Sequence, residues 1–204
     1  MNRNLRRRAK SSSKGDRNHL RRRAHEAVTG GDWSAAAKAY RQLVQADPGS
    51  ANDWSDLGSI YLMIGDSTGA EIALGKAIAL APNSVNALSN MANLKRQMGE
   101  NDAAMGLYRQ VLDLEPGRAN TWHEIARIKR FQPDDPDIDR IEALLESGKL
   151  DEQGVMHGAF ALGKAYEDMG KYDVAFNNLR RANAIKRAAL PFDLSHEVRQ
   201  IDRL

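Results

Sequence analysis

The sequence predicts an all-α solenoid built of about five helical hairpins. The chain repeats itself with a period of 34 residues: residues 51–84 align over residues 85–118 without a gap, and their large and small positions coincide. Within each repeat the apolar residues recur every three or four positions, as they do on the buried face of an α-helix. A hairpin of this length buries its apolar face only against its neighbours, so the repeats are expected to stack.

The glycines and prolines of these two repeats predict where the helices end. Gly65 and Gly99 are expected to end the first helix of each hairpin, because glycine readily adopts the left-handed backbone that follows a helix. Pro82 and Pro116 are expected to end the second helix, because the proline ring blocks its continuation. Each repeat is therefore predicted to consist of a helix, a tight turn and a second helix that ends at the proline.

The same pattern extends to both sides. A first unit covers residues 17–50, and a degenerate unit of 37 residues, in which the glycine turn is lost, covers 119–155. The motif returns in 156–190, whose last helix should run to about Leu190, because Arg187 replaces the terminal proline. Residues 191–204 keep apolar residues at helical spacing and are predicted to form a C-terminal connector helix.

The degenerate unit contains the acidic stretch PDDPDID. Asp135 or Asp137 is expected to cap a new helix, with Pro136 tolerated in its first turn. A calcium loop would require a central glycine and a distant bidentate glutamate, and the stretch has neither. Capping and solvation are therefore the preferred interpretation of these carboxylates.

Composition and length exclude several classes of protein. The chain has 204 residues, 42% hydrophobic and 28% charged, as in soluble globular proteins. No apolar run approaches the roughly 20 residues that a membrane crossing needs, and the N-terminus lacks the apolar centre of a secretory signal. Zero cysteines exclude disulfides and thiolate chemistry and favour a cytoplasmic location.

The positive charge is concentrated at the N-terminus. Residues 1–25 hold ten of the 30 Lys and Arg residues but only one acid, so they carry a net charge of +9 and the remainder −6. Residues 1–16 are predicted to form a disordered basic arm. Weak nonspecific contact with nucleic acid or another anionic surface, and organellar targeting, remain open alternatives.

No motif predicts catalysis, cofactor binding or metal binding. The stretch GAEIALGK (69–76) mimics a phosphate-binding loop, but its glycine spacing is wrong and it lies inside a predicted helix. The five histidines are scattered, and no pair has the i, i+4 spacing of a zinc site on one helix. Each is interpreted as a surface or groove residue.

The 34-residue period, with a large residue, Leu, Gly and Tyr followed by Gly, Ala, an aromatic residue and Pro, resembles the tetratricopeptide repeat (TPR). The resemblance implies a right-handed superhelix whose concave groove, lined by first helices, binds peptides or partner domains. Arg21, His25 and Asp56 depart from the pattern of chaperone-docking members. Asn and Arg side chains at groove positions can bind a peptide backbone and carboxylates, although simple solvation of a surface is the alternative. The candidate groove residues are Asn52, Ser55, Ser59, Asn86, Ser89, Asn93, Arg96, Asn120, His123, Arg127 and Arg130.

The C-terminal third, residues 160–204, is similar to the segment that joins repeats to the catalytic domain in bacterial TPR-containing sulfotransferases. That resemblance implies a following domain that binds phosphoadenosine phosphosulfate, and this chain contains no such domain. The chain alone is therefore interpreted as a non-catalytic protein-interaction scaffold without a cofactor, either the repeat half of a sulfotransferase-type protein or a free-standing adaptor that binds a peptide in its groove. The matching residues are Gly163, Lys164, Tyr166, Glu167, Asp168, Gly170, Tyr172, Asp173, Ala175, Phe176, Ala182, Asn183, Lys186 and Arg187.

Overall fold

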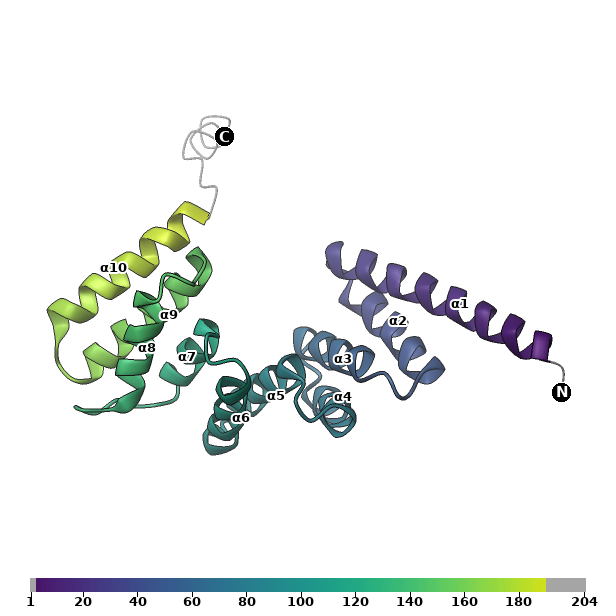
Figure 1. Ribbon diagram of the computed structural model, residues 1–204, viewed down its shortest axis with the longest axis horizontal. Coiled ribbons are helices and arrows are strands. Elements are labelled where there is room, and N and C mark those ends of the chain that lie inside the picture. The colour runs from purple at the N-terminus through teal and green to yellow at the C-terminus, as the bar shows by residue number, and fades with distance from the viewer. Residues whose placement is uncertain (1–2, 190–204) are drawn as a thin grey trace, which may run out of the picture. The chain divides into compact units, whose positions relative to one another are not determined.

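The computed structural model describes residues 3–189, with side chains from residue 15 onward. The described residues form ten α-helices and no strand, which confirms the all-α class (Figure 1). The helices are α1 (Arg3–Thr29), α2 (Trp33–Ala46), α3 (Ala51–Met63), α4 (Ser67–Leu80), α5 (Val85–Gln97), α6 (Asn101–Leu114), α7 (Ala119–Ala126), α8 (Pro136–Glu146), α9 (Glu152–Asp168) and α10 (Tyr172–Ala189).

The turn inside each regular hairpin is built in the same way. In the α3–α4 turn, Gly65 has a φ of +77°, and its N–H donates to the Leu62 carbonyl. The N–H of Asp66 donates to the Tyr61 carbonyl at 2.9 Å, and the Asp66 side chain then caps α4. This pair of backbone bonds satisfies the last carbonyls of α3. Glycines at the same register, each with φ between +72° and +79°, form the turns after α1, α5 and α9.

The ends of the second helices also agree with the sequence prediction. α4 ends at Leu80 and α6 at Leu114, each two residues before a proline. α10, which has Arg187 in place of that proline, continues to Ala189. As predicted, the second helix of a hairpin therefore ends just before the proline where one is present, and it continues where the proline is absent.

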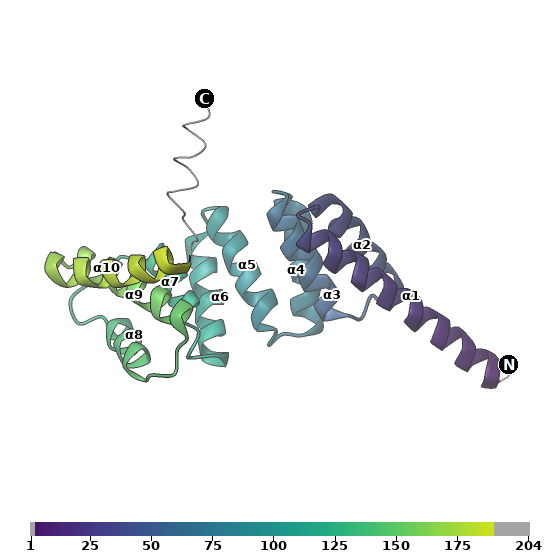
Figure 2. The same cartoon turned by 90° about the horizontal axis from the view of Figure 1, so that it is seen from above.

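The chain divides into two compact units, Met1–Leu114 and Glu115–Leu204. In the first unit, the hairpins α1–α2, α3–α4 and α5–α6 pack in sequence, with α2 against α3 and α4 against α5 (Figure 2). Leu74 of α4 is fully buried and packs in one cluster with Leu94 of α5. Apolar contacts between successive hairpins thus form the core of this unit.

The second unit departs from the repeat. α7 packs on α9 rather than on α8, and α8 and α10 also pack on α9. The degenerate unit 119–155 is therefore not a closed hairpin, because α7 has only eight residues and a long connector separates it from α8. α9 begins at Glu152, before the predicted boundary at Met156, because Asp151 caps it by accepting the Gly154 N–H at 2.7 Å.

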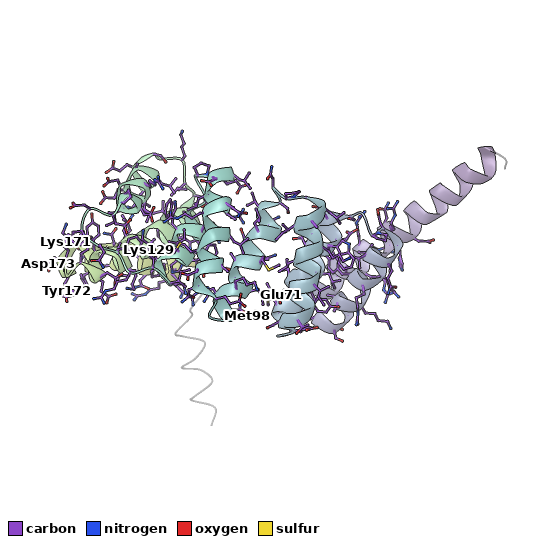
Figure 3. All side chains as sticks on the ribbon, turned by 90° about the horizontal axis from the view of Figure 1, so that it is seen from below. Glu71, Met98, Lys129, Lys171, Tyr172 and Asp173 are labelled. Atoms are coloured by element: carbon purple, nitrogen blue, oxygen red, sulfur yellow. The ribbon has the colours of Figure 1, made fainter. Side chains whose placement is uncertain are left out.

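Ion pairs hold the connector before α8 in place. Asp135 caps α8 with Pro136 in its first turn, as predicted. Asp137, expected to be solvated, is only 2% exposed, and its carboxylate lies 2.5 Å from the ammonium group of Lys129. Lys129 is labelled in Figure 3. Lys129 also pairs with Asp135 at 2.7 Å. The buried carboxylate is tolerated because a cation from the same connector neutralises it.

The N-terminal basic stretch is helical in this structure, because α1 begins at Arg3. This differs from the disordered arm expected for residues 1–16. Arg, Lys, Leu and Ala favour helix, and no proline interrupts the stretch. Further along, Arg21 binds the buried Asp53 carboxylate through two hydrogen bonds of 2.8 and 3.2 Å, which ties α1 to α3. The predicted connector helix 191–204 lies outside the described residues.

Candidate binding surfaces

The predicted groove residues divide between the two units. Those of the first unit lie on α3 and α5, and those of the second lie on α7 and the connector that follows it. Asn52 and Asn86 are exposed at the starts of α3 and α5. Arg130 is exposed on the connector.

Part of the first set is already engaged within the fold. Ser55 is only 5% exposed, so it is inaccessible to a partner. The Asn93 side-chain oxygen accepts a 2.7 Å hydrogen bond from the Tyr108 hydroxyl of α6. The Ser89 hydroxyl is buried. The accessible polar surface of this unit is therefore narrower than the repeat register alone suggests.

In the second unit, two of the predicted residues open onto one cavity. It has a volume of about 340 Å³ and lies among α7, α9 and α10. His123 and Arg127 line it from α7 and its C-terminal end. Side chains that the groove prediction did not include complete the lining, namely Phe160, Lys164 and Glu167 of α9 and Leu179 of α10, together with Ala126.

The cavity combines basic groups with an apolar wall. Arg127 forms a long, 3.4 Å ion pair with Glu124, and its side chain is 52% exposed, so other guanidinium donors can reach a ligand. Lys164 pairs with Asp168 on its own helix. Phe160 and Leu179 supply the apolar contact. This arrangement suits a carboxylate that lies beside an apolar group.

His123, which lines this cavity, is paired with His157, which lines a second one. The Nδ1 atoms of His123 on α7 and His157 on α9 lie 3.2 Å apart, and His123 stacks on Phe160 with ring centroids 5.3 Å apart. Burial lowers the pKa of both imidazoles, and the neighbouring imidazole lowers the pKa of His123 further. The sequence carried no direct signal for this pair: the unit that holds His123 has 37 residues, so the repeat register places Phe160 rather than His157 at the equivalent position of α9.

Two smaller cavities lie among the described residues as well. One, of about 220 Å³, lies beside His157 and includes Asn120 and Asp151 in its lining. The other, of about 260 Å³ in the first unit, lies between α2, α3 and α4 and is lined in part by Trp54 and Tyr61. The Trp54 indole N–H donates to the Pro48 carbonyl at 2.9 Å, which fixes the ring.

The described residues hold neither a membrane-spanning helix nor a cluster of metal ligands. No helix in the described range is long and apolar enough to cross a membrane. Nor do three or more His, Cys, Asp or Glu side chains gather there as ligands for one metal ion.

Helical hairpins that share one glycine turn and one 34-residue register define an α-helical repeat protein. Tetratricopeptide-repeat family models match residues 21–85, 87–120 and 158–188, which together make up more than half of the chain. The chain therefore belongs to the tetratricopeptide-repeat family, and its fold is an all-α solenoid of such repeats. The degenerate stretch between the last two matches corresponds to the part where α7 and α8 fail to close a hairpin.

Solved structures of repeat proteins share this fold. The chain is similar to MamA, with 22% identity over 81% of this chain and 95% of that one, at a TM-score of 0.61. It is also similar to the first repeat domain of Spaghetti (RPAP3) bound to the HSP90 peptide SRMEEVD, with 22% identity over 55% and 89% of the chains and a TM-score of 0.53. A Thermobaculum terrenum O-GlcNAc transferase variant matches at 20% identity over 66% of this chain but 26% of its own, with a TM-score of 0.57. Among curated proteins, none matches the sequence at a significant level.

Proposed function

We propose that this chain is a protein-interaction scaffold that binds an extended peptide, and that the 340 Å³ cavity of the second unit holds one anchoring part of it. The observation that carries the proposal is the lining of that cavity, where Arg127, Lys164 and His123 surround an apolar wall. Tetratricopeptide-repeat domains generally act as scaffolds, which supports this class of function. The fold neighbour RPAP3 is bound to an acidic peptide, SRMEEVD.

The cavity chemistry predicts the kind of peptide. Arg127 can bind a carboxylate through two parallel hydrogen bonds, and Lys164 can add a second charge-assisted contact. An apolar side chain next to the carboxylate would then contact Phe160 and Leu179. The expected ligand is therefore a peptide segment in which an acidic residue, or the C-terminal carboxylate, adjoins an apolar residue.

The test measures the affinity of the full chain for a set of fluorescent peptides. The affinity of variants of the chain for the tightest-binding peptide is then measured in the same way. Arg127→Ala and Lys164→Ala should each weaken the best acidic-apolar peptide by about tenfold, the scale of one lost charge-assisted contact. Arg130→Ala is the matched control, because that arginine is exposed and lies outside the cavity lining. Equal affinity of Arg127→Ala, Arg130→Ala and the parent chain would refute the cavity as the anchoring site.

The groove predicted in the first unit is a separate part of this proposal. Asn86 is exposed, and Asn93 retains an amide group beside its bond to Tyr108. Alanine at Asn86 and Asn93 together should abolish peptide capture by this unit if the peptide runs along its first helices, α3 and α5. Undiminished capture by the double variant would contradict peptide binding by these residues.

A more specific proposal for the kind of protein rests on the resemblance of residues 160–204 to TPR-containing sulfotransferases. We propose that the chain is the non-catalytic repeat half of a sulfotransferase-type protein, with a free-standing adaptor as the alternative. Catalysis, and binding of phosphoadenosine phosphosulfate, are expected only with an added catalytic domain. The coding sequence beyond codon 204 separates the two: a strand and a phosphate-binding loop in frame favour the first, and a stop codon favours the adaptor.

We further place the protein in the cytoplasm, because a chain without cysteine suits a reducing compartment. The basic N-terminal segment is proposed to make weak, nonspecific contact with nucleic acid or another anionic surface. Support comes from its net charge of +9 over residues 1–25. Imaging of a C-terminally tagged protein would test the location, since exclusive organellar signal would favour the targeting alternative for this segment.

A further inference from the structure

The histidine pair of the second unit has a geometry that peptide binding does not require. His123 and His157 come from different helices, α7 and α9, which pack directly on each other. Their Nδ1 atoms lie 3.2 Å apart, and stacking on Phe160 limits rotation of the His123 ring. The two side chains are half-buried, so the separation is set by the packing of two helices.

This separation matches the distance between two ligands of one metal ion. Zinc binds imidazole nitrogen at about 2.0–2.1 Å with tetrahedral angles, which places two such nitrogens about 3.3 Å apart. A hydrogen bond between one protonated and one unprotonated Nδ1 accounts for the same distance when no metal is present. Replacement of that shared proton by a cation would keep the distance between the two nitrogens and would require the rings to turn until both Nδ1 lone pairs point at the metal.

The residues around the histidine pair carry charge, and two cavities give solvent access to the pair. Glu124 lies close enough to act electrostatically on both imidazoles, and Asp151 acts on His157. Arg127 and Lys186 oppose a cation from the His123 side. The 340 Å³ cavity reaches His123, and the 220 Å³ cavity reaches His157, so solvent can approach the pair from both sides. Burial favours the neutral imidazoles that a metal requires.

We propose that His123 and His157 form a two-imidazole binding site for a divalent transition metal of the zinc class, with solvent completing its coordination. Imidazole ligands suit Zn²⁺, Cu²⁺ and Ni²⁺ rather than Mg²⁺ or Ca²⁺. Two protein ligands leave the remaining positions open, so the site is weaker than a closed structural zinc site. A bound cation would also add positive charge to the edge of the proposed peptide cavity.

The experiment is a calorimetric titration of the metal-free full chain with Zn²⁺ at neutral pH. His157→Gln keeps a polar side chain of similar size but removes the imidazole, and it should weaken zinc binding by about tenfold or more. His157→Cys supplies a thiolate ligand in its place and should retain binding. His25→Ala is the matched control, because His25 is exposed on α1, and it should bind like the parent chain. Circular dichroism confirms that each variant is folded.

Electron paramagnetic resonance of the Cu²⁺-loaded chain adds a structural readout. The expected spectrum shows coordination by two nitrogens in the parent chain and by fewer in His157→Gln. The proposal is overturned if a folded His157→Gln variant binds Zn²⁺ as the parent does, or if the parent binds none at millimolar Zn²⁺. Neither result depends on a peptide ligand, so the metal site and the proposed scaffold function fail or stand separately.

Discussion

At the scale of single residues, the repeat depends on small side chains where helices cross. A Cβ atom added at Gly58 of α3 would lie 2.5 Å from Leu74 Cγ of α4, and one at Gly163 of α9 would lie 2.6 Å from Leu179 Cδ2 of α10. Both glycines occupy the same position in the repeat. Close packing against these two leucines, and not backbone conformation, therefore favours glycine at Gly58 and Gly163.

We expect Gly58→Ala to lower the free energy of unfolding by about 1–2 kcal/mol, because overpacking outweighs the gain in helix propensity. Gly75→Ala is the matched control, since nothing lies within 4 Å of its added Cβ in α4. It should raise stability by up to about 1 kcal/mol. Urea unfolding of both variants measures the difference, and equal effects would contradict the packing argument.

Asp56 on α3 is a second residue with a measurable consequence. Desolvation raises the pKa of the Asp56 carboxyl, and the negative charge of the nearby Asp53 raises it further. A hydrogen bond from the Tyr40 hydroxyl and the positive charge of Arg21 act in the opposite direction. A pKa raised by folding gives stability that is present below the unfolded pKa and lost as pH rises through the folded pKa. At neutral pH the ionised Asp56 therefore makes a small unfavourable contribution.

Asp56→Asn keeps a hydrogen-bond acceptor for Tyr40 and removes the charge. We expect the variant to be more stable than the parent chain at neutral pH by about 0.5 kcal/mol, the scale of a partly exposed charge. The difference should shrink as the pH falls through the raised pKa of Asp56, because the parent carboxyl then becomes protonated and loses its charge. Urea unfolding across this range tests it, and a difference independent of pH would count against this origin.

At the scale of elements, the start of α10 differs from the starts of the second helices in the first two hairpins. Asp32 and Asp66 cap α2 and α4, whereas Lys171 occupies the equivalent position before α10. Its carbonyl accepts the first helical hydrogen bond, from the Ala175 N–H. Its ammonium group lies 5.6 Å from the centre of the Tyr166 ring. A cation here opposes the positive end of the helix dipole.

Lys171→Asp should stabilise the second unit by about 0.5–1.5 kcal/mol, because it supplies both a side-chain cap and a favourable charge, less the lost cation–π contact. The reciprocal change, Asp66→Ala, should cost the first unit about 1 kcal/mol. Hydrogen exchange of amides in α10 and α4 resolves the two effects. Loss of protection in α10 of the Lys171→Asp variant would contradict the prediction.

The outer face of α10 also differs from those of the earlier second helices. Val44 and Leu112, one on α2 and one on α6, are buried apolar residues at a position where α10 carries Asn183. Asn183 is exposed. A polar residue at a position otherwise used for contact with the next hairpin is typical of a terminal repeat.

At the scale of the whole molecule, charge is distributed unevenly along the chain. The net charge of +9 in residues 1–25 contrasts with −6 in the rest. Deletion of residues 1–16 should therefore remove weak binding to random duplex DNA. For the full chain, the logarithm of the association constant should fall with the logarithm of salt concentration with a slope of about −5, as for about six phosphate contacts. Salt-independent binding in a filter or anisotropy assay would exclude this contact.

Most helix boundaries were predictable because their causes are local. Gly65 and Pro82 act on backbone within a few residues of themselves, and Asp135 caps the helix that starts beside it. The degenerate unit was harder. The burial of Asp137 depends on its ion pair with Lys129, which is eight residues away across an irregular connector. Such a pair cannot be predicted from a periodic sequence pattern.

The candidate site was predictable only in part. His123 and Arg127 followed from the repeat register, but Lys164, Glu167 and Leu179 line the same cavity from two other helices. The histidine pair was missed because the two residues lie on different helices and at non-equivalent positions of the repeat, so neither the spacing within one helix nor the repeat register brings them together. Ser55 was assigned to an accessible face because the register does not report how closely neighbouring helices cover it.

By itself, then, the sequence determined the family, the all-α class, the turns and the ends of most helices, since these depend on periodicity and on residues close together in the chain. Only the tertiary structure decided which polar side chains are accessible, which imidazoles meet and where a cavity opens. Those properties depend on the packing of helices that the sequence places tens of residues apart, and on the desolvation that this packing imposes.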